Sequence, residues 1–164
     1  MEYNKIAGAP ISWGVCEVPN WGHQMSPERV FGEMASLGLK GTEFGPLGFL
    51  PVEPSERAAV LSKLDMHATG GFFLVLLHKA DHDPLESVKA ELESYLASGA
   101  NTLVLAADSG LVGYDDKLEP LTDEEWQRVF TNLDRISDYA NSFNIKAVLH
   151  PHVGTIVETP DDIR

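Results

Sequence analysis

Residues 83–107, DPLESVKAELESYLASGANTLVLAA, carry a helix signal followed directly by a strand signal. Pro84 suits the first turn of a helix, and Gly99 suits the left-handed position just after one. Between them apolar residues recur at helical spacing, and the ones expected to face the core are Leu85, Val88, Leu92 and Leu96. The continuous apolar run 102–107 is typical of a strand buried on both faces. The stretch therefore predicts a helix that packs on a parallel sheet.

The same alternation extends in both directions along the chain. Helices are predicted to begin at Ser26-Pro27, at Ser55 and at a capping box that starts at Thr122. Their expected apolar faces are Val30, Phe31, Met34 and Leu37; Ala59, Val60 and Leu64; and Trp126, Val129, Phe130, Leu133, Ile136 and Phe143. The other runs expected to be strands are 6–13, 41–45, 72–78 and 147–150. Strands that alternate with helices indicate an α/β fold with a parallel sheet.

Two α/β architectures fit this pattern: an open doubly wound sheet, or part of a (β/α)8 TIM barrel, which takes about 250 residues. No G-x-G-x-x-G or Walker sequence follows a predicted strand, which weakens the nucleotide-binding versions of the open sheet. The length of 164 residues favours the open sheet, whereas residues 159–164, TPDDIR, favour the barrel because they start a capped helix that stops after one turn. We therefore expect residues 1–164 to be a single domain, the N-terminal part of a TIM barrel with about its first five βα units, truncated at the start of the fifth helix.

Composition and charge argue against several classes of function. The 43% of hydrophobic residues is enough for a core, which argues against disorder. The net charge of -13, without a cluster of Lys or Arg, argues against nucleic-acid and anionic-membrane partners. The longest apolar run, 72–77, is far shorter than the roughly 20 residues that a bilayer span needs. A single cysteine, Cys16, and an N-terminus without signal-peptide features indicate a soluble cytoplasmic protein.

Candidate functional residues gather where the predicted strands end. Ligands bind beyond the carboxyl ends of the strands in parallel α/β sheets. The polar residues at these ends are Glu43, His78, Asp108, His150 and His152. Each of them could also be a loop residue or the partner of a helix cap, but their common position favours a site. Four aromatic residues in or beside the loops after the first two strands could form an apolar platform for a sugar ring or belong to the core: Trp13, Trp21, Phe44 and Phe49.

His150 and His152 are two residues apart, so their side chains would face the same way if the strand continued through them. Two imidazoles with this geometry can bind one metal ion. Pro151 weakens this interpretation, because it removes a donor from the ladder and indicates that the strand is ending. The alternative is one ligand or acid–base histidine, with the other histidine binding a substrate hydroxyl.

Three stretches resemble a known family: PISWGVCEVPNWG at 10–22, GTEFGPLGFLP at 41–51 and HPHVGTIVETPDDI at 150–163. They are similar to the inosose dehydratase branch of the sugar-phosphate isomerase/epimerase, or xylose isomerase-like, superfamily of TIM barrels, and the resemblance spans essentially the whole chain. It implies a complete (β/α)8 barrel in the family and a divalent metal such as manganese or cobalt. The implied reaction belongs to inositol catabolism and removes water from 2-keto-myo-inositol, or inosose, to give a cyclohexane dione. A small polyol or sugar-like substrate is therefore expected.

The resemblance also implies roles for individual residues. Metal-dependent members of the superfamily hold the ion with Glu, Asp, His and Glu from four strands in the second half of the barrel. His150 lies at about the first of these places, where it would replace the usual carboxylate, and the other ligands are expected on strands six to eight, beyond this sequence. Glu158 resembles a glutamate that contacts substrate hydroxyls. The expected catalytic residues are Glu43, His78 and His152, the expected substrate-binding residues are Trp13, Phe44, Asp108 and Glu158, and the expected metal ligand is His150.

Other functions remain open. A ketose epimerase or a hydroxypyruvate-type isomerase would share the enolisation step with a dehydratase but return the proton instead of expelling hydroxide. Half a barrel could also be a non-catalytic sugar-binding or assembly module. An open five-stranded fragment leaves strand edges unpaired, so two copies could associate through them as a homo-oligomer.

Overall fold

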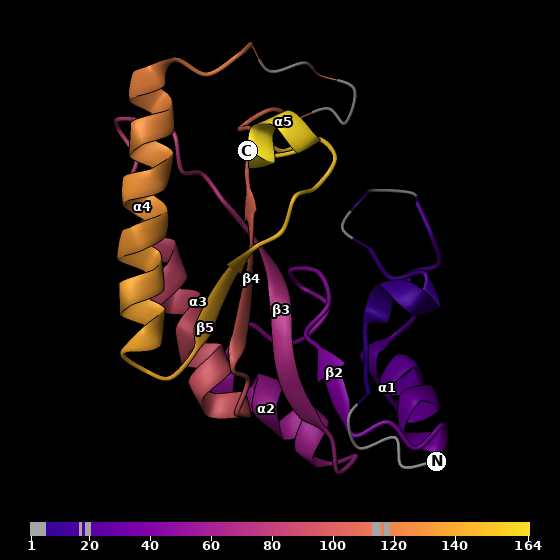
Figure 1. Ribbon diagram of the computed structural model, residues 1–164. Coiled ribbons are helices and arrows are strands. Elements are labelled where there is room, and N and C mark those ends of the chain that lie inside the picture. The colour runs from indigo at the N-terminus through magenta and orange to yellow at the C-terminus, as the bar shows by residue number, and fades with distance from the viewer. Residues whose placement is uncertain (1–5, 17, 19–20, 113–115, 117–118) are drawn as a thin grey trace. The chain divides into compact units, whose positions relative to one another are not determined.

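The computed structural model describes residues 6–164 except 17, 19, 20, 113–115, 117 and 118, and its strands and helices alternate along the chain (Figure 1). The strands are β1 (Ala7–Gly8), β2 (Gly41–Glu43), β3 (His67–Val75), β4 (Thr102–Ala107) and β5 (Lys146–Leu149). The helices are α1 (Pro27–Ser36), α2 (Pro54–Ser62), α3 (Pro84–Ser98), α4 (Asp123–Asn141) and α5 (Pro160–Ile163), with a 3-10 helix, η1 (Pro10–Trp13). The strands form one sheet in the order β1-β2-β3-β4-β5, and β2 is parallel to both β1 and β3. This alternation confirms the predicted α/β class and matches successive βα units of a barrel.

The chain forms two compact units, the first made of Met1–Phe72 with Leu92–Thr102 and the second of Phe73–Glu91 with Leu103–Arg164. In the first unit, α1 begins at its predicted cap, where the Oγ of Ser26 accepts a hydrogen bond from the backbone N–H of Arg29. Its buried residues are Val30, Phe31 and Met34. Leu37, predicted to share that face, is 61% exposed because the helix has ended at Ser36.

The first predicted strand, 6–13, is wrong after residue 8, since η1 follows β1 almost at once. Pro10 occupies the first turn of η1, and Gly14, with a φ of 81°, ends it. Proline has no N–H for a strand ladder, and its fixed φ suits a helical first turn. Trp13 is therefore the last residue of a short helix and not of a strand.

β3 starts at His67, five residues before the predicted start at 72, and ends at Val75 and not at His78. The Gly70-Gly71 pair interrupts the apolar pattern in the sequence, but it lies inside the strand. A Cβ atom at Gly70 would lie 2.1 Å from the backbone oxygen of Thr102, so only glycine fits this close approach of two backbones.

The helix after β2 turns another face to the core than predicted, whereas the helix after β3 buries Val88 and Leu92 as predicted and departs from the prediction at Leu96. In α2, Arg57 and Leu61 are buried, whereas Ala59 is exposed. In α3, Tyr95 is fully buried, whereas Leu96 is 51% exposed. Arg57 can be buried because its Nε donates to a backbone carbonyl oxygen at 3.0 Å while its apolar stem packs inside.

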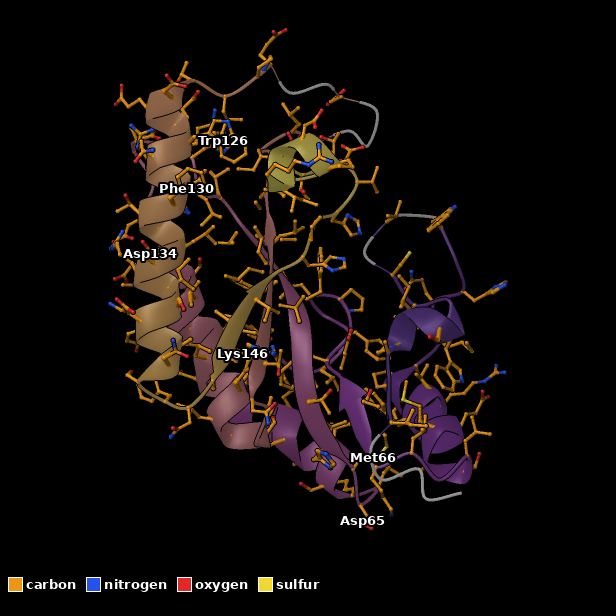
Figure 2. All side chains as sticks on the ribbon, in the orientation of Figure 1. Asp65, Met66, Trp126, Phe130, Asp134 and Lys146 are labelled. Carbon is orange, nitrogen blue, oxygen red and sulfur yellow. The ribbon has the colours of Figure 1, made fainter. Side chains whose placement is uncertain are left out.

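In the second unit, α4 packs against β5 and begins at the predicted capping box (Figure 1). Thr122 Oγ1 accepts from the backbone N–H of Glu125, whose carboxylate accepts from the backbone N–H of Thr122. The buried residues of α4 are Val129, Asn132, Ile136 and Ala140. Phe130 and Phe143, predicted to be buried, are 51% and 39% exposed, and Phe130 stacks on Trp126 one turn away (Figure 2). Asn132 occupies the core face because its amide bonds to a strand end.

The turn and the cap at the end of the chain follow the predicted local signals, whereas β5 (Lys146–Leu149) lies one residue before the predicted strand 147–150, so His150 lies outside it. Asn144, with a φ of 60°, ends the turn after α4, and β5 begins two residues later. Thr159 and Asp162 form a capping box at the start of α5. Within the part of the chain that the structure describes, no helix is long and apolar enough to cross a membrane.

Candidate functional site

Three candidate residues, His78, Asp108 and His150, lie at the carboxyl ends of β3, β4 and β5 in the second unit. The ends of these strands are joined in register, because Asp108 N–H donates to the carbonyl oxygen of Val75 at 2.9 Å and His150 N–H to that of Leu105 at 2.8 Å. The structure therefore brings the three residues to the same edge of the sheet, which is where parallel α/β sheets bind ligands.

His78 is the most buried of the candidates, with 1% of its surface exposed. Among the described residues, neither of its ring nitrogens has a hydrogen-bond partner. Burial lowers the pKa of His78, and the nearby Lys79 ammonium lowers it further, while Glu125 and Asp108 act in the opposite direction. A neutral imidazole with one N–H donor and one acceptor nitrogen is therefore held inside the protein, and buried polar atoms of this kind are usually paired in native structures.

The backbone around His78 is held by two side chains of α4. Arg128 Nη1 donates to the carbonyl oxygen of His78 at 2.8 Å, and Asn132 Nδ2 donates to that of Leu77 at 2.9 Å. Sequence patterns did not identify either residue. Asn132 gave one usable signal, since it is a polar residue on the face that Val129 and Ile136 turn to the core.

Asp108 is half-buried, and both its side chain and its backbone form hydrogen bonds with neighbouring loops. Its Oδ1 accepts a hydrogen bond from Gly110 N–H at 2.9 Å, and its backbone forms an antiparallel bridge with Thr155. Ile156 N–H also donates to the carbonyl oxygen of Ala107 at 2.9 Å. The loop after β5 is thus fixed to the carboxyl end of β4.

That loop carries the remaining candidates of the second unit. His150 is exposed and His152 half-buried, with their ring centroids 5.7 Å apart. His152 Nδ1 lies 2.8 Å from the carbonyl oxygen of Val153. Glu158, predicted to bind substrate hydroxyls, accepts a hydrogen bond from Gly154 N–H at 3.1 Å through Oε2. This contact joins the two ends of the segment 154–158 in the loop.

The described residues do not assemble a metal site by themselves. Among them, no group of three His, Cys, Asp or Glu side chains is arranged to hold an ion. Zinc sites in proteins take three or four protein ligands, and larger divalent ions take more oxygen ligands. His150 and His152 amount to a pair at most, so the donor set found here does not fit a resident metal.

The other candidates, Glu43, Phe44 and Trp13, lie in the first unit. Glu43 is half-buried where the pairing of β2 with β3 shifts register, since Thr42 pairs with Ala68 and Glu43 with Gly70, as at a β-bulge. Such a bulge re-aims the side chain beside it and is frequent next to active sites. The catalytic role of Glu43 stays a prediction.

The two aromatic candidates make protein contacts within the first unit. Phe44 is 4% exposed, with the edge of Tyr95 against its ring at 5.1 Å and the Arg57 guanidinium at 5.2 Å. Trp13 Nε1 donates to Glu33 Oε2 at 2.9 Å. Phe44 has the surroundings of a core residue and Trp13 is tied to α1, so their sugar-binding roles stay predictions.

A cavity of about 460 Å³ lies between the loop after β3 and α4. Its lining residues are Lys79, Ala80, Asp81, His82, Asp83, Arg128, Asn132 and Arg135. Both arginines are already paired, Arg128 with Glu124 at 2.9 Å and Arg135 with Asp83 at 3.0 Å. The positive charges of both arginines at this cavity are therefore neutralised by carboxylates of the protein itself.

Comparisons with known proteins give relatives that are longer than this chain. No family model matches it. The chain is 31% identical to an inosose dehydratase from Lacticaseibacillus casei over an alignment of 163 residues. This alignment covers 94% of this chain and 54% of that protein. The chain spans about half the length of the curated relatives it matches.

Solved structures show the same fold and the same partial coverage. The IolI protein with a bound zinc atom matches with a TM-score of 0.69 at 15% identity, over 96% of this chain and 55% of that one. A xylose isomerase-like TIM-barrel protein from Mycobacterium smegmatis in complex with magnesium matches with a TM-score of 0.63 at 16% identity, over 96% of this chain and 58% of that one. These matches confirm the prediction of a partial TIM barrel.

Proposed function

Because the chain belongs to the inosose dehydratase branch of the xylose isomerase-like TIM barrels, as its motifs predicted, we propose that it provides part of the active site of a carbon–oxygen lyase. The proposed reaction removes water from inosose, or from a closely related cyclic β-hydroxy ketone, in inositol catabolism. The small polyol substrate and the cytoplasmic location belong to the same proposal.

The reaction needs two proton transfers and a place for negative charge. A base removes the proton next to the carbonyl, the electron pair of that C–H bond forms a C=C bond, and the C–O bond of the β-hydroxyl breaks as an acid protonates it to water. A hydrogen-bond donor at the enolate oxygen lowers the barrier. In this proposal the proton transfers are shared by Glu43, His78 and His152, and the substrate is bound by Trp13, Phe44, Asp108 and Glu158.

The structural observation that carries the proposal is the state of His78. Burial keeps its pKa below the ordinary value, so its ring is neutral at pH 7. A neutral imidazole can accept a proton at one nitrogen and donate a hydrogen bond from the other. Because His78 is 1% exposed, water competes weakly for these nitrogens, and a bound hydroxyl or carbonyl group would satisfy them.

The proposal includes a divalent ion. Two structural relatives contain zinc and magnesium, which favours a divalent metal in general, and manganese or cobalt is the specific expectation here. His150 would be one ligand. The described residues supply no group of three, so an ion would need ligands besides those that this part of the chain brings together. Metal analysis of the purified 164-residue protein should find less than one bound manganese or cobalt ion per chain.

The activity is tested by incubating the protein with inosose and following the dione by absorbance and mass spectrometry. We expect His78→Asn and Glu43→Gln to reduce turnover by roughly 100-fold or more, the usual contribution of an acid–base group. His67→Asn is a matched control, because His67 is exposed at the amino end of β3 and has no proposed role. If both site variants keep the wild-type turnover rate, the assignment of these residues is wrong.

Two alternatives give different products. A ketose epimerase or hydroxypyruvate-type isomerase would convert free sugars without loss of water, which product analysis would detect. A non-catalytic sugar-binding or assembly module would bind such a substrate without converting it. Turnover of inosose by the 164-residue protein would exclude this module, and native mass spectrometry would show whether copies associate.

A further inference from the structure

The backbone of His152 is hydrogen-bonded on both sides within its own loop. Its N–H donates to the carbonyl oxygen of Val157 at 3.0 Å. Its carbonyl oxygen accepts from the backbone N–H of Thr155 at 3.2 Å and lies 2.8 Å from the hydroxyl Oγ1, whose one hydrogen is shared with the carbonyl oxygen of Val157 at 3.0 Å. Three hydrogen bonds therefore define where the His152 side chain starts.

Thr155 is itself fixed to the sheet. It is 8% exposed, and its neighbours Ile156 and Val157 are 5% and 3% exposed. The antiparallel bridge between Thr155 and Asp108 continues the pairing at the carboxyl end of β4. The hydroxyl of Thr155 thus links His152 to an anchored segment.

The ring of His152 has a defined hydrogen-bond direction. Its Nδ1 lies 2.8 Å from the carbonyl oxygen of Val153. A carbonyl oxygen can only accept, so Nδ1 carries the hydrogen in this contact. In the neutral ring, the hydrogen on Nδ1 leaves the lone pair on Nε2.

We propose that Thr155 is a positioning residue that holds His152 as the tautomer protonated at Nδ1, so that Nε2 is the atom that accepts a hydrogen bond from a substrate hydroxyl. The part about the substrate rests on the proposed function. The part about the tautomer rests only on the contacts of the loop.

The tautomer is measured by NMR on the 164-residue protein with 15N-labelled histidine, at an alkaline pH where imidazoles are neutral. His152→Gln identifies the His152 signals by their loss. In the wild type we expect the pattern of a protonated Nδ1 and an unprotonated Nε2. Thr155→Val removes the hydroxyl at similar volume and should convert this pattern into a mixture of both tautomers, whereas Thr155→Ser should retain it.

Thr131→Val is the matched control, since the Thr131 hydroxyl also donates to a backbone carbonyl, that of Gln127, but within α4. It should leave the His152 signals unchanged. A wild-type His152 protonated at Nε2 would overturn the proposal, and so would a folded Thr155→Val protein with an unchanged tautomer or a Thr155→Ser protein that loses it. If the tautomer is as proposed but inosose is not turned over, the proposed function fails and the positioning of His152 stands.

Discussion

Replacing Asn132 with alanine tests how strongly α4 holds the carboxyl end of β3. Asn132 is 5% exposed, its Nδ2 donates to the carbonyl oxygen of Leu77 at 2.9 Å, and its Oδ1 accepts from Arg135 at 2.9 Å. The substitution leaves the carbonyl oxygen of Leu77, a fully buried residue, without this donor. An unsatisfied buried carbonyl costs about 1–3 kcal/mol. Alanine is the better helix former by roughly 0.6 kcal/mol, which opposes the loss. We expect the free energy of unfolding to fall by about 1–2 kcal/mol.

Asn141→Ala is the control, because it makes the same change on the same helix at an exposed position. Asn141 Nδ2 donates to Ser137 Oγ at 3.3 Å, so the free energy of unfolding should change by no more than about 0.5 kcal/mol. Urea unfolding followed by circular dichroism measures the difference. With a slope of about 2 kcal/mol per molar urea, Asn132→Ala should lower the midpoint by roughly 0.5–1 M relative to Asn141→Ala. Equal midpoints for the two variants would refute the idea that the buried bond stabilises this strand end.

Three further predictions concern backbone packing, protonation and capping. Gly70→Ala would place a Cβ atom 2.1 Å from the Thr102 oxygen and should lower Tm strongly or prevent folding. Gly32→Ala, whose Cβ would have nothing within 4 Å, should raise the stability by up to about 1 kcal/mol. Equal Tm values for the two variants would contradict this. The pKa of His78 is lowered in the folded state, so its contribution to stability is present above the unfolded value of about 6.5 and is lost as the pH falls below it. Tm should therefore drop from pH 7 to pH 5 more steeply in the wild type than in His78→Leu. Parallel curves would count against a buried neutral ring. Thr122→Ala removes both contacts of the Thr122 hydroxyl with Glu125, leaves the Thr122 N–H bond to the Glu125 carboxylate in place, and should cost about 1 kcal/mol in urea unfolding. An unchanged midpoint would mean that the hydroxyl cap is dispensable.

Local signals predicted three helix starts correctly, whereas α2 begins at Pro54 without a side-chain cap and ends at Ser62. Ser26, Thr122 and Thr159 each act as the cap that their sequence context indicated. These interactions involve residues three positions apart, so the sequence alone contains both partners. The limits of β4 were also predicted correctly, because a short apolar run after Gly99 leaves little choice.

The errors depend on partners distant in the sequence. Gly70 looks like an interruption until the backbone of Thr102 is seen beside it. The face of α4 was predicted from hydrophobicity alone, which selected Phe130 and missed Asn132, whose place in the core depends on a carbonyl oxygen 55 residues away. Of the candidate site, the sequence predicted which residues follow β3, β4 and β5. The role of Thr155 was not predicted, since a threonine in a polar loop has no pattern of its own.

The tie between α4 and the end of β3 has a practical meaning for protein engineering. Arg128 and Asn132 secure His78 from behind, through backbone carbonyl oxygens and not through the imidazole. A mutant library made to test the proposed function should therefore keep positions 128 and 132 constant while it varies the exposed loop residues 79–83. Libraries that randomise the helix as well would mix variants with a changed loop and variants whose histidine has lost its support, and an activity screen would not separate the two.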